Sequence, residues 1–201
     1  MKKNIKHKVF SLLINVLALG IFQSCSCPNQ PDATPKPNAY HRIDLPANHQ
    51  YNRYQDPNCP FAFEVERSAT VQNVPNSNCW KNIVYPKLQA TLYLSYKKIN
   101  TPNDLIEYTE DSYKLTFKHS IKANAIGEQR IGKPNQNVYG LLYTIEGNAA
   151  TPVQFYLTDS TQHFLRAALY FNASPNADSI APVLQFIKKD LDRLIQTFEW
   201  Q

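Results

Sequence analysis

Three apolar runs within residues 137–172 constrain the fold of this chain more than any other feature. They cover residues 138–146, 153–158 and 163–172, are rich in Tyr, Phe, Leu, Ile and Val, and are separated by turn residues. Such runs are typical of strands, and short connections favour antiparallel neighbours. The third run is apolar on both of its faces, which indicates a strand inside a sheet that is covered on both sides. We therefore predict that the three runs form the centre of an antiparallel sheet.

Alternating patterns elsewhere predict six further strands, at residues 40–46, 61–65, 69–74, 82–85, 88–96 and 125–131. A helix is predicted from Thr101, a good N-cap with Pro102 and Asp104 at favourable positions, to about residue 121. A second helix is predicted to begin with Ser179 as its N-cap, which places Pro182 in the first turn. Its apolar residues recur at steps of three and four, so one face packs on the sheet. The expected fold is α+β, a single domain with a mainly antiparallel sheet flanked by two helices.

The charge of the chain gives no sign of a nucleic-acid partner. The formal net charge of the 201 residues is +5, and four lysines without a neighbouring acid lie in the first eight residues, so the remainder carries +5 less 4, or +1. No basic stripe occurs elsewhere, and binding to nucleic acid requires one. One domain of about this size buries enough surface to fold without a metal.

The N-terminus has the pattern of an export signal. A basic start precedes an apolar run at residues 9–22, which is short for a membrane span. Ser24-Cys25 follows and resembles the lipobox of bacterial lipoproteins, which implies cleavage after residue 24 and lipidation of Cys25. Ordinary cleavage nearby, an uncleaved signal anchor and the weaker candidate Cys27 are the alternatives. We predict a signal peptide at 1–24, a lipidated, proline-rich linker at 25–39 and a globular domain at 40–201.

Cys59 and Cys79 form the second predicted site. Both follow an asparagine and lie in turns that close the same region. Two cysteines of this kind in an exported protein usually pair, and a bridge over about 20 residues would stabilise the fold by roughly 3 kcal/mol. A metal or redox pair is the alternative, but the sequence has no CxxC motif and no nearby pair of histidines.

No catalytic set emerges from the residues. Asp159, Ser160 and His163 are close in sequence, but they follow a strand directly and read as a hairpin turn. The histidines have no metal-ligand spacing, so we expect no metal and no cofactor. Arg166 lies among apolar neighbours, and we predict a structural ion pair with Glu146 rather than a binding cleft.

Several strings resemble the GldD family of gliding motility lipoproteins from the Bacteroidetes. They are YHRIDLP (40–46), CPFAFEV (59–65), CWKNIVYPK (79–87), KHSIKA (118–123) and YGLLYTIEGNAATPVQFYLTDSTQHFLRAALYFN (139–172), followed by the APVLQFIKKDL and FEW strings near the end. The resemblance implies a role in gliding, association with type IX secretion, and no known catalytic residue. The order of elements also resembles that of PsbP-type proteins. Asp159-Ser160-Thr161 is similar to Bacteroidetes O-glycosylation sites, which makes Ser160 a candidate for modification.

The resemblance and the anchor together predict where the protein lies and what it does. Surface lipoproteins of the Bacteroidetes often carry an acidic cluster after the lipidated cysteine, and none follows Cys25, which favours a location that faces the periplasm. We expect the periplasmic face of the outer membrane rather than the inner membrane. The first hypothesis is a non-catalytic interaction module that binds cell-envelope proteins of the gliding and type IX secretion machinery. The alternative is a periplasmic binding module for a small lipid or glycan ligand, and an enzyme of unknown type is the third.

Overall fold

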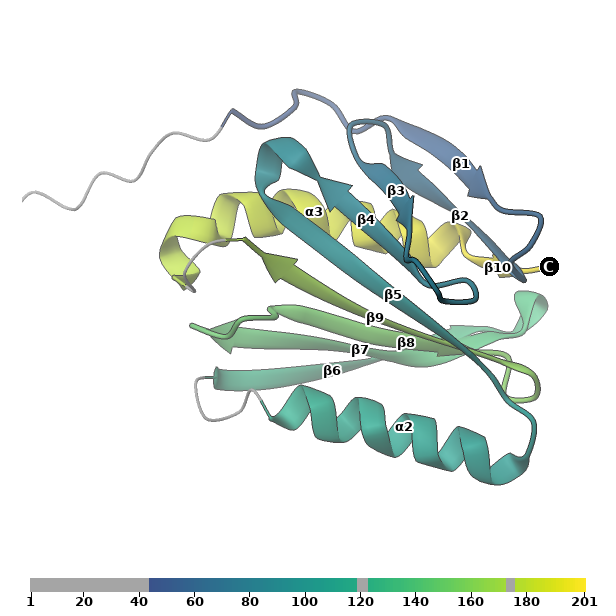
Figure 1. The fold of residues 1–201 in the computed structure, drawn as a ribbon. Coiled ribbons are helices and arrows are strands. Elements are labelled where there is room, and N and C mark those ends of the chain that lie inside the picture. The colour runs from purple at the N-terminus through teal and green to yellow at the C-terminus, as the bar shows by residue number, and fades with distance from the viewer. Residues whose placement is uncertain (1–43, 119–122, 173–175) are drawn as a thin grey trace, which may run out of the picture. The chain divides into compact units, whose positions relative to one another are not determined.

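A seven-stranded sheet forms the centre of the computed structural model, which describes residues 44–118, 123–172 and 176–201 (Figure 1). Every pair of neighbouring strands in it is antiparallel. In spatial order the strands are β3 (Thr70–Asn73), β4 (Lys81–Tyr85), β5 (Ala90–Lys98), β9 (His163–Phe171), β8 (Val153–Thr158), β7 (Val138–Gly147) and β6 (Ala123–Lys133). The three runs that we placed at the centre are β7, β8 and β9, and they pair in that order.

One face of this sheet carries the main core. Side chains of a strand alternate between faces, so the register brings apolar residues of neighbouring strands together. Leu92 of β5 lies opposite Leu169 of β9, and Ala167 of β9 lies opposite Phe155 of β8. All four are buried, which explains why the apolar alternation in these strands predicts them well.

A helix and a small second sheet cover that face. The helix α3 (Ala177–Thr197) contributes its buried stripe to the same core. The small sheet has the order β1 (Tyr51–Gln55), β2 (Phe61–Glu66) and β10 (Glu199–Trp200), all antiparallel. Three fully buried rings, Phe61, Phe63 and Phe198, stack between β2 and the end of α3. The C-terminal strand is thereby held against the first half of the domain.

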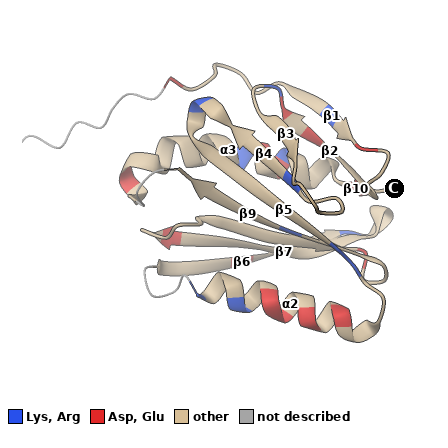
Figure 2. Cartoon of the chain, in the orientation of Figure 1, with Lys and Arg blue, Asp and Glu red and all other residues tan. Residues whose placement is uncertain are grey.

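Of the described residues, those of α2 (Pro102–Phe117) cover part of the opposite face of the sheet, and Figure 2 shows acidic residues along this helix. Thr101 and Asp104 form the predicted capping box, with the Thr101 hydroxyl 2.7 Å from the Asp104 carboxylate. The helix packs on β8 and β9, where Tyr108 contacts Phe164. Two one-turn 3-10 helices, η2 (Pro86–Leu88) and η4 (Pro134–Gln136), connect β4 to β5 and β6 to β7.

The α+β fold class predicted from the sequence is confirmed, but four details are wrong. Residues 44–46 form no strand, and residues 40–43 of that predicted strand lie outside the described part of the chain. The short strands β1 and β10 were missed because neither carries a strong apolar alternation. α2 ends at Phe117, four residues before the predicted end.

The fourth difference is the start of α3. Asn176 is its N-cap and accepts a hydrogen bond from the Ser179 backbone N–H at 3.3 Å, whereas the Ser179 hydroxyl donates back to the Asn176 carbonyl at 3.1 Å. The helix therefore begins almost one turn earlier than predicted. Pro182 consequently lies inside the helix rather than in its first turn, on the exposed side.

Candidate functional site

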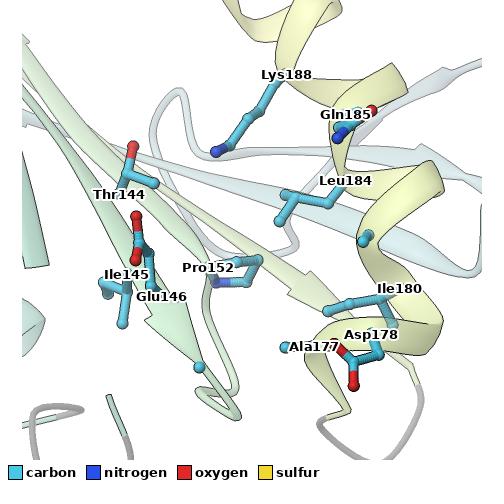
Figure 3. A pocket seen from close by; sticks show the side chains of 12 residues that line it. Thr144, Ile145, Glu146, Pro152, Ala177, Asp178, Ile180, Leu184, Gln185 and Lys188 are labelled. Atoms are coloured by element: carbon cyan, nitrogen blue, oxygen red, sulfur yellow. The ribbon is translucent and has the colours of Figure 1, made fainter. Parts of the chain in front are cut away.

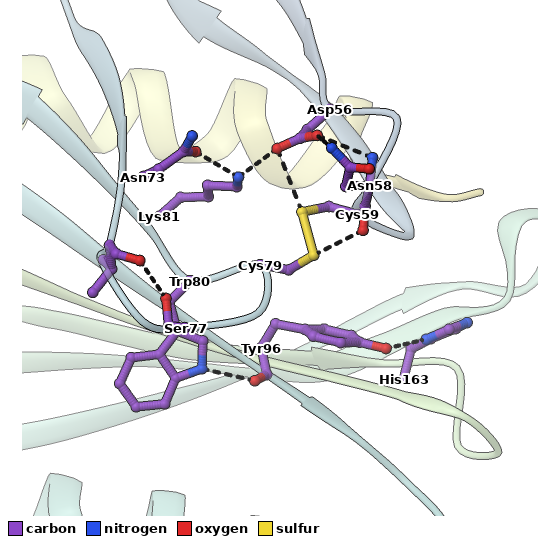
Figure 4. The surroundings of a disulfide bond; sticks show 11 residues. Asp56, Asn58, Cys59, Asn73, Ser77, Cys79, Trp80, Lys81, Tyr96 and His163 are labelled. Carbon is purple, nitrogen blue, oxygen red and sulfur yellow. Dashed lines mark hydrogen bonds and ion pairs between the residues drawn. A yellow bond between two sulfur atoms is a disulfide. The ribbon is translucent and has the colours of Figure 1, made fainter.

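The two cysteines that we singled out are bonded to each other. Cys59 and Cys79 form a disulfide with their Cα atoms 5.4 Å apart (Figure 4). The bond joins the turn before β2 to the turn before β4, and Cys79 has a positive φ of 63°. In the described ranges no group of three or more His, Cys, Asp or Glu side chains could hold a metal ion.

A buried ion pair lies beside the disulfide. The Lys81 ammonium is 2.5 Å from the Asp56 carboxylate and 2.7 Å from the Asn73 side-chain oxygen (Figure 4). The hydrogen bond from Lys81 holds the pKa of Asp56 below its usual value. Burial by itself would lower the pKa of Lys81, but the interactions with Asp56 and Tyr54 together outweigh burial and raise that pKa. The pair therefore stays charged and ties the two disulfide-linked turns together.

Trp80 follows the disulfide directly and forms one wall of a pocket. Its indole N–H donates to the Tyr96 carbonyl at 2.9 Å, while 41% of the residue stays exposed (Figure 4). The pocket has a volume of about 250 Å³ and lies between α2 and strands β5 and β9. Phe164 and Leu115 add apolar surface to it. The disulfide, the buried pair and the indole hydrogen bond together fix this wall.

Arg166 of β9 also lines this pocket. Its guanidinium donates a hydrogen bond to the side-chain oxygen of Gln154, which is 1% exposed. The Gln154 amide in turn donates to the Thr151 hydroxyl at 2.8 Å. The predicted ion pair with Glu146 is wrong, because the register places Gln154 diagonally next to Arg166, whereas Glu146 is exposed on β7 opposite Ala125.

A second cation at the pocket is already neutralised. The Lys97 ammonium lies 4.0 Å from the Asp111 carboxylate and 4.3 Å from the centre of the Tyr108 ring. All three residues line the pocket. Arg166 differs from Lys97 because none of its partners in the described ranges is a carboxylate. Burial lowers the pKa of Arg166 from its ordinary value, although a guanidinium remains charged.

Asp159, Ser160 and His163 do not form a catalytic set. The Asp159 carboxylate accepts hydrogen bonds from the backbone N–H groups of Thr161, Gln162 and His163 at 2.8 to 2.9 Å, so it caps the turn between β8 and β9. The His163 ring bonds instead to the Tyr96 hydroxyl at 2.8 Å. Ser160 is exposed, with a positive φ of 67°. The sequence interpretation as a hairpin turn agrees with this arrangement.

Sequence reasoning missed a buried polar cluster between β1 and α3. Asp190 is 3% exposed, lies 2.6 Å from the His49 ring nitrogen and accepts from the Tyr51 hydroxyl at 3.1 Å. Burial raises the pKa of Asp190, and burial beside that carboxylate raises the pKa of Tyr51 to about 12. The His49 ring stacks on Phe186 with the ring centres 4.1 Å apart. These contacts hold β1 and the residues just ahead of it against the helix.

Another pocket, of about 310 Å³, lies where β7 ends and α3 begins. Figure 3 shows Lys188 extending from α3 toward β7, with Glu146 and Pro152 on the strand side. Its walls combine isolated charges with small apolar groups, and no described hydrogen bond orients Lys188 or Glu146. The pocket beside α2 is therefore the better defined candidate site.

The fold and this site define a single α+β domain with a small aromatic and cationic pocket on one face. Among solved structures, the solution structure of cyanobacterial PsbP (CyanoP) from Synechocystis is similar, with 13% identity over 75% of this chain and 92% of that one and a TM-score of 0.48. No curated protein matches the sequence significantly. No helix of the described residues is long and apolar enough to cross a membrane.

Residues 30–200 match the family described as gliding motility lipoprotein GldD. The chain belongs to this family, as the strings quoted above predict. Family membership identifies it as a lipoprotein of the gliding motility class, with partners expected in membrane-associated machinery. Cys25, the predicted lipidation site, lies outside the described residues.

Proposed function

We propose that the protein is a lipid-anchored envelope component required for gliding motility and associated with type IX secretion, where it acts as a non-catalytic interaction module. Membership of the gliding motility lipoprotein family over residues 30–200 is the observation that carries this proposal. The hydrogen bonding of Asp159 and His163 supports a non-catalytic role, because the Asp159 carboxylate caps the turn and the His163 ring is bonded to the Tyr96 hydroxyl of β5.

The proposed anchor is the N-terminus. Residues 1–24 act as the signal peptide, Cys25 receives the lipid, including palmitate, and residues 25–39 link it to the domain at 40–201. We place the anchor in the outer membrane with the domain on the periplasmic side. Labelling cells with radioactive palmitate tests this: a Cys25→Ala variant should lose the label, and a Cys27→Ala variant should keep it. Retention of label in Cys25→Ala together with loss in Cys27→Ala would move the anchor to Cys27.

The surface proposed to meet a partner is the part of the sheet that α2 leaves open. Tyr93 is 42% exposed there and contacts Tyr170 edge to face at 5.5 Å. Exposed aromatic residues are enriched where proteins bind one another. A photo-crosslinking residue at position 93 should capture an envelope protein in gliding cells, whereas the same residue at exposed Lys189 on α3 should not. Equal capture at both positions, or at neither, would contradict this placement.

The alternative function, a binding module for a small lipid or glycan, is favoured by one observation, the pocket beside α2. The two functions differ in their ligands, since a macromolecule needs the open surface and a small molecule needs the pocket.

Ser160 is a separate proposal, an O-glycosylation site on the exposed turn between β8 and β9. Mass spectrometry of the protein from its own cells tests it, because Ser160→Ala should remove the added sugar mass.

A further inference from the structure

The Arg166 guanidinium is partly withdrawn from water, and none of its partners in the described ranges is a carboxylate. Charged groups withdrawn from water are normally paired with an opposite charge, since desolvation is costly. Lys81, Lys97 and Arg193 each have a carboxylate within 4.0 Å. Arg166 is only partly exposed, yet its guanidinium donates its hydrogen bond to the neutral amide of Gln154. Its positive charge is therefore available to an anion from outside the chain.

The surroundings of Arg166 hold it ready for such an anion. Its partner Gln154 donates a hydrogen bond to the Thr151 hydroxyl at 2.8 Å, and the Thr116 hydroxyl, which donates to the Ser112 carbonyl, lies 3.4 Å from the Gln154 oxygen. The side chains of Gln154, Thr151 and Thr116 are all buried. A side chain that is ordered before binding loses little rotamer entropy when the ligand arrives. The guanidinium also presents its donors as a planar fork that matches a carboxylate.

The rest of the pocket limits what can bind. Its volume of about 250 Å³ is below the 300 to 1,000 Å³ that is usual for drug-sized ligands, so roughly one ring-sized group fits. The Trp80 indole supplies a partly exposed flat wall, while the Tyr108 ring already has the Lys97 ammonium against its face. Lys97 neutralises Asp111, so Arg166 sets the sign of the local charge.

We propose that this pocket binds the carboxylate of a small acidic sugar, with Arg166 as the anion anchor and Trp80 as the stacking wall. The apolar C–H face of a sugar ring suits the indole, and its hydroxyls suit polar groups at the pocket such as Ser95. The proposal deepens the alternative function given above, on which it rests. It does not depend on the membrane anchor or on the partner that meets Tyr93.

Two components of a bacterial envelope carry such a group. One is the cell-wall peptidoglycan, whose muramic acid bears a carboxylate. The other is the acidic keto-sugar at the base of outer-membrane polysaccharide. Both sources offer the group that suits this pocket, a carboxylate on a single sugar ring. The experiment therefore compares the acidic sugar of each source.

The experiment is isothermal titration calorimetry of the full-length protein in detergent. The probes are N-acetylmuramic acid and 3-deoxy-octulosonic acid, with neutral N-acetylglucosamine as the matched control. At least one acid should bind, and N-acetylglucosamine should bind about tenfold or more weakly, which corresponds to about 1.4 kcal/mol. Which of the two acids binds identifies the source. Failure of both acids, or equal binding of the neutral sugar, would overturn the proposal.

Variants locate the binding. Arg166→Gln and Trp80→Ala should each weaken binding of the preferred acid by about tenfold or more, and Arg166→Lys should retain part of it because the charge remains. Arg130→Gln is the matched control, since Arg130 is exposed on β6 and does not line this pocket. Thermal unfolding of each variant shows whether it is folded, and Arg166→Lys serves if Arg166→Gln is not. Unchanged affinity in a folded Arg166 variant would refute the assignment. An Arg166 variant that loses sugar binding but still cross-links normally at position 93 would show that the pocket and the partner surface around Tyr93 act independently.

Discussion

Removing the disulfide between Cys59 and Cys79 should destabilise the domain by an amount that can be worked out from the chain. The bond closes a loop with a sequence separation of 20 residues. In the chain-entropy treatment, opening a loop of that length costs about 3 kcal/mol of folding free energy at 25 °C. For a domain of this size, that corresponds to a fall in Tm of about 6 to 12 °C. The double variant Cys59→Ala, Cys79→Ala tests this without leaving a free thiol from the pair.

Urea unfolding is the suitable assay. The midpoint should fall while the dependence on urea changes little, because the folded state keeps its core and most of the same surface is exposed on unfolding. Dithiothreitol should reproduce the loss in the wild-type protein and should have no further effect on the double variant. A double variant that unfolds at the wild-type urea midpoint would refute the reasoning and would mean that the Lys81–Asp56 pair alone holds the two turns together.

Three further predictions concern stability. In urea unfolding, Asp56→Ala should lower the free energy of unfolding by about 3 to 5 kcal/mol, because it leaves the buried Lys81 ammonium without its carboxylate. Lys81→Met should lower it clearly less, because this change removes the buried charge, and the reverse order of the two effects would contradict the argument. Gly140→Ala should destabilise by about 1 to 3 kcal/mol, because an added Cβ would lie 1.9 Å from the backbone oxygen of Tyr156, and a neutral effect would show that β7 can shift. Burial raises the pKa of Asp190, so the folded protein holds the proton of this carboxyl group more tightly than the unfolded chain does. The stability that this protonation contributes is fully present below the unfolded pKa of about 3.9 and is lost as the pH rises through the folded pKa. Asp190→Asn should therefore gain stability relative to wild type as the pH is raised from 4 to 7, and a relative loss over that range would refute this.

The parts of the fold that could be predicted are those that local pattern determines. The strands β7, β8 and β9 begin at the predicted residues, Val138, Val153 and His163. Their starts could be predicted because an alternation with a period of two residues marks the buried face of a strand. The cysteine pair was recognisable because exported chains with two turn cysteines usually join them. The start of α3 was misjudged because Asn176 and Ser179 both have cap chemistry, and only the backbone decides between them.

The candidate site could not be predicted because it depends on register and on distant segments. Arg166 meets Gln154 only through the pairing of β8 with β9, and a shift by one residue would point it to the other face of the sheet. His49 and Asp190 are 141 residues apart in sequence, so no local pattern connects them. Trp80 becomes a pocket wall only after α2 has packed on the sheet beside it.

The attachment of His49 and Tyr51 to Asp190 has a mechanical consequence. Any pull on the chain ahead of the domain is transmitted along the backbone into β1, which has only β2 as a partner in its sheet. The hydrogen bonds of His49 and Tyr51 to Asp190 also attach this part of the chain to α3, a helix that belongs to the main core. With the N-terminal anchor that we propose, these two bonds would brace the domain at the place where a pull from the anchor enters it.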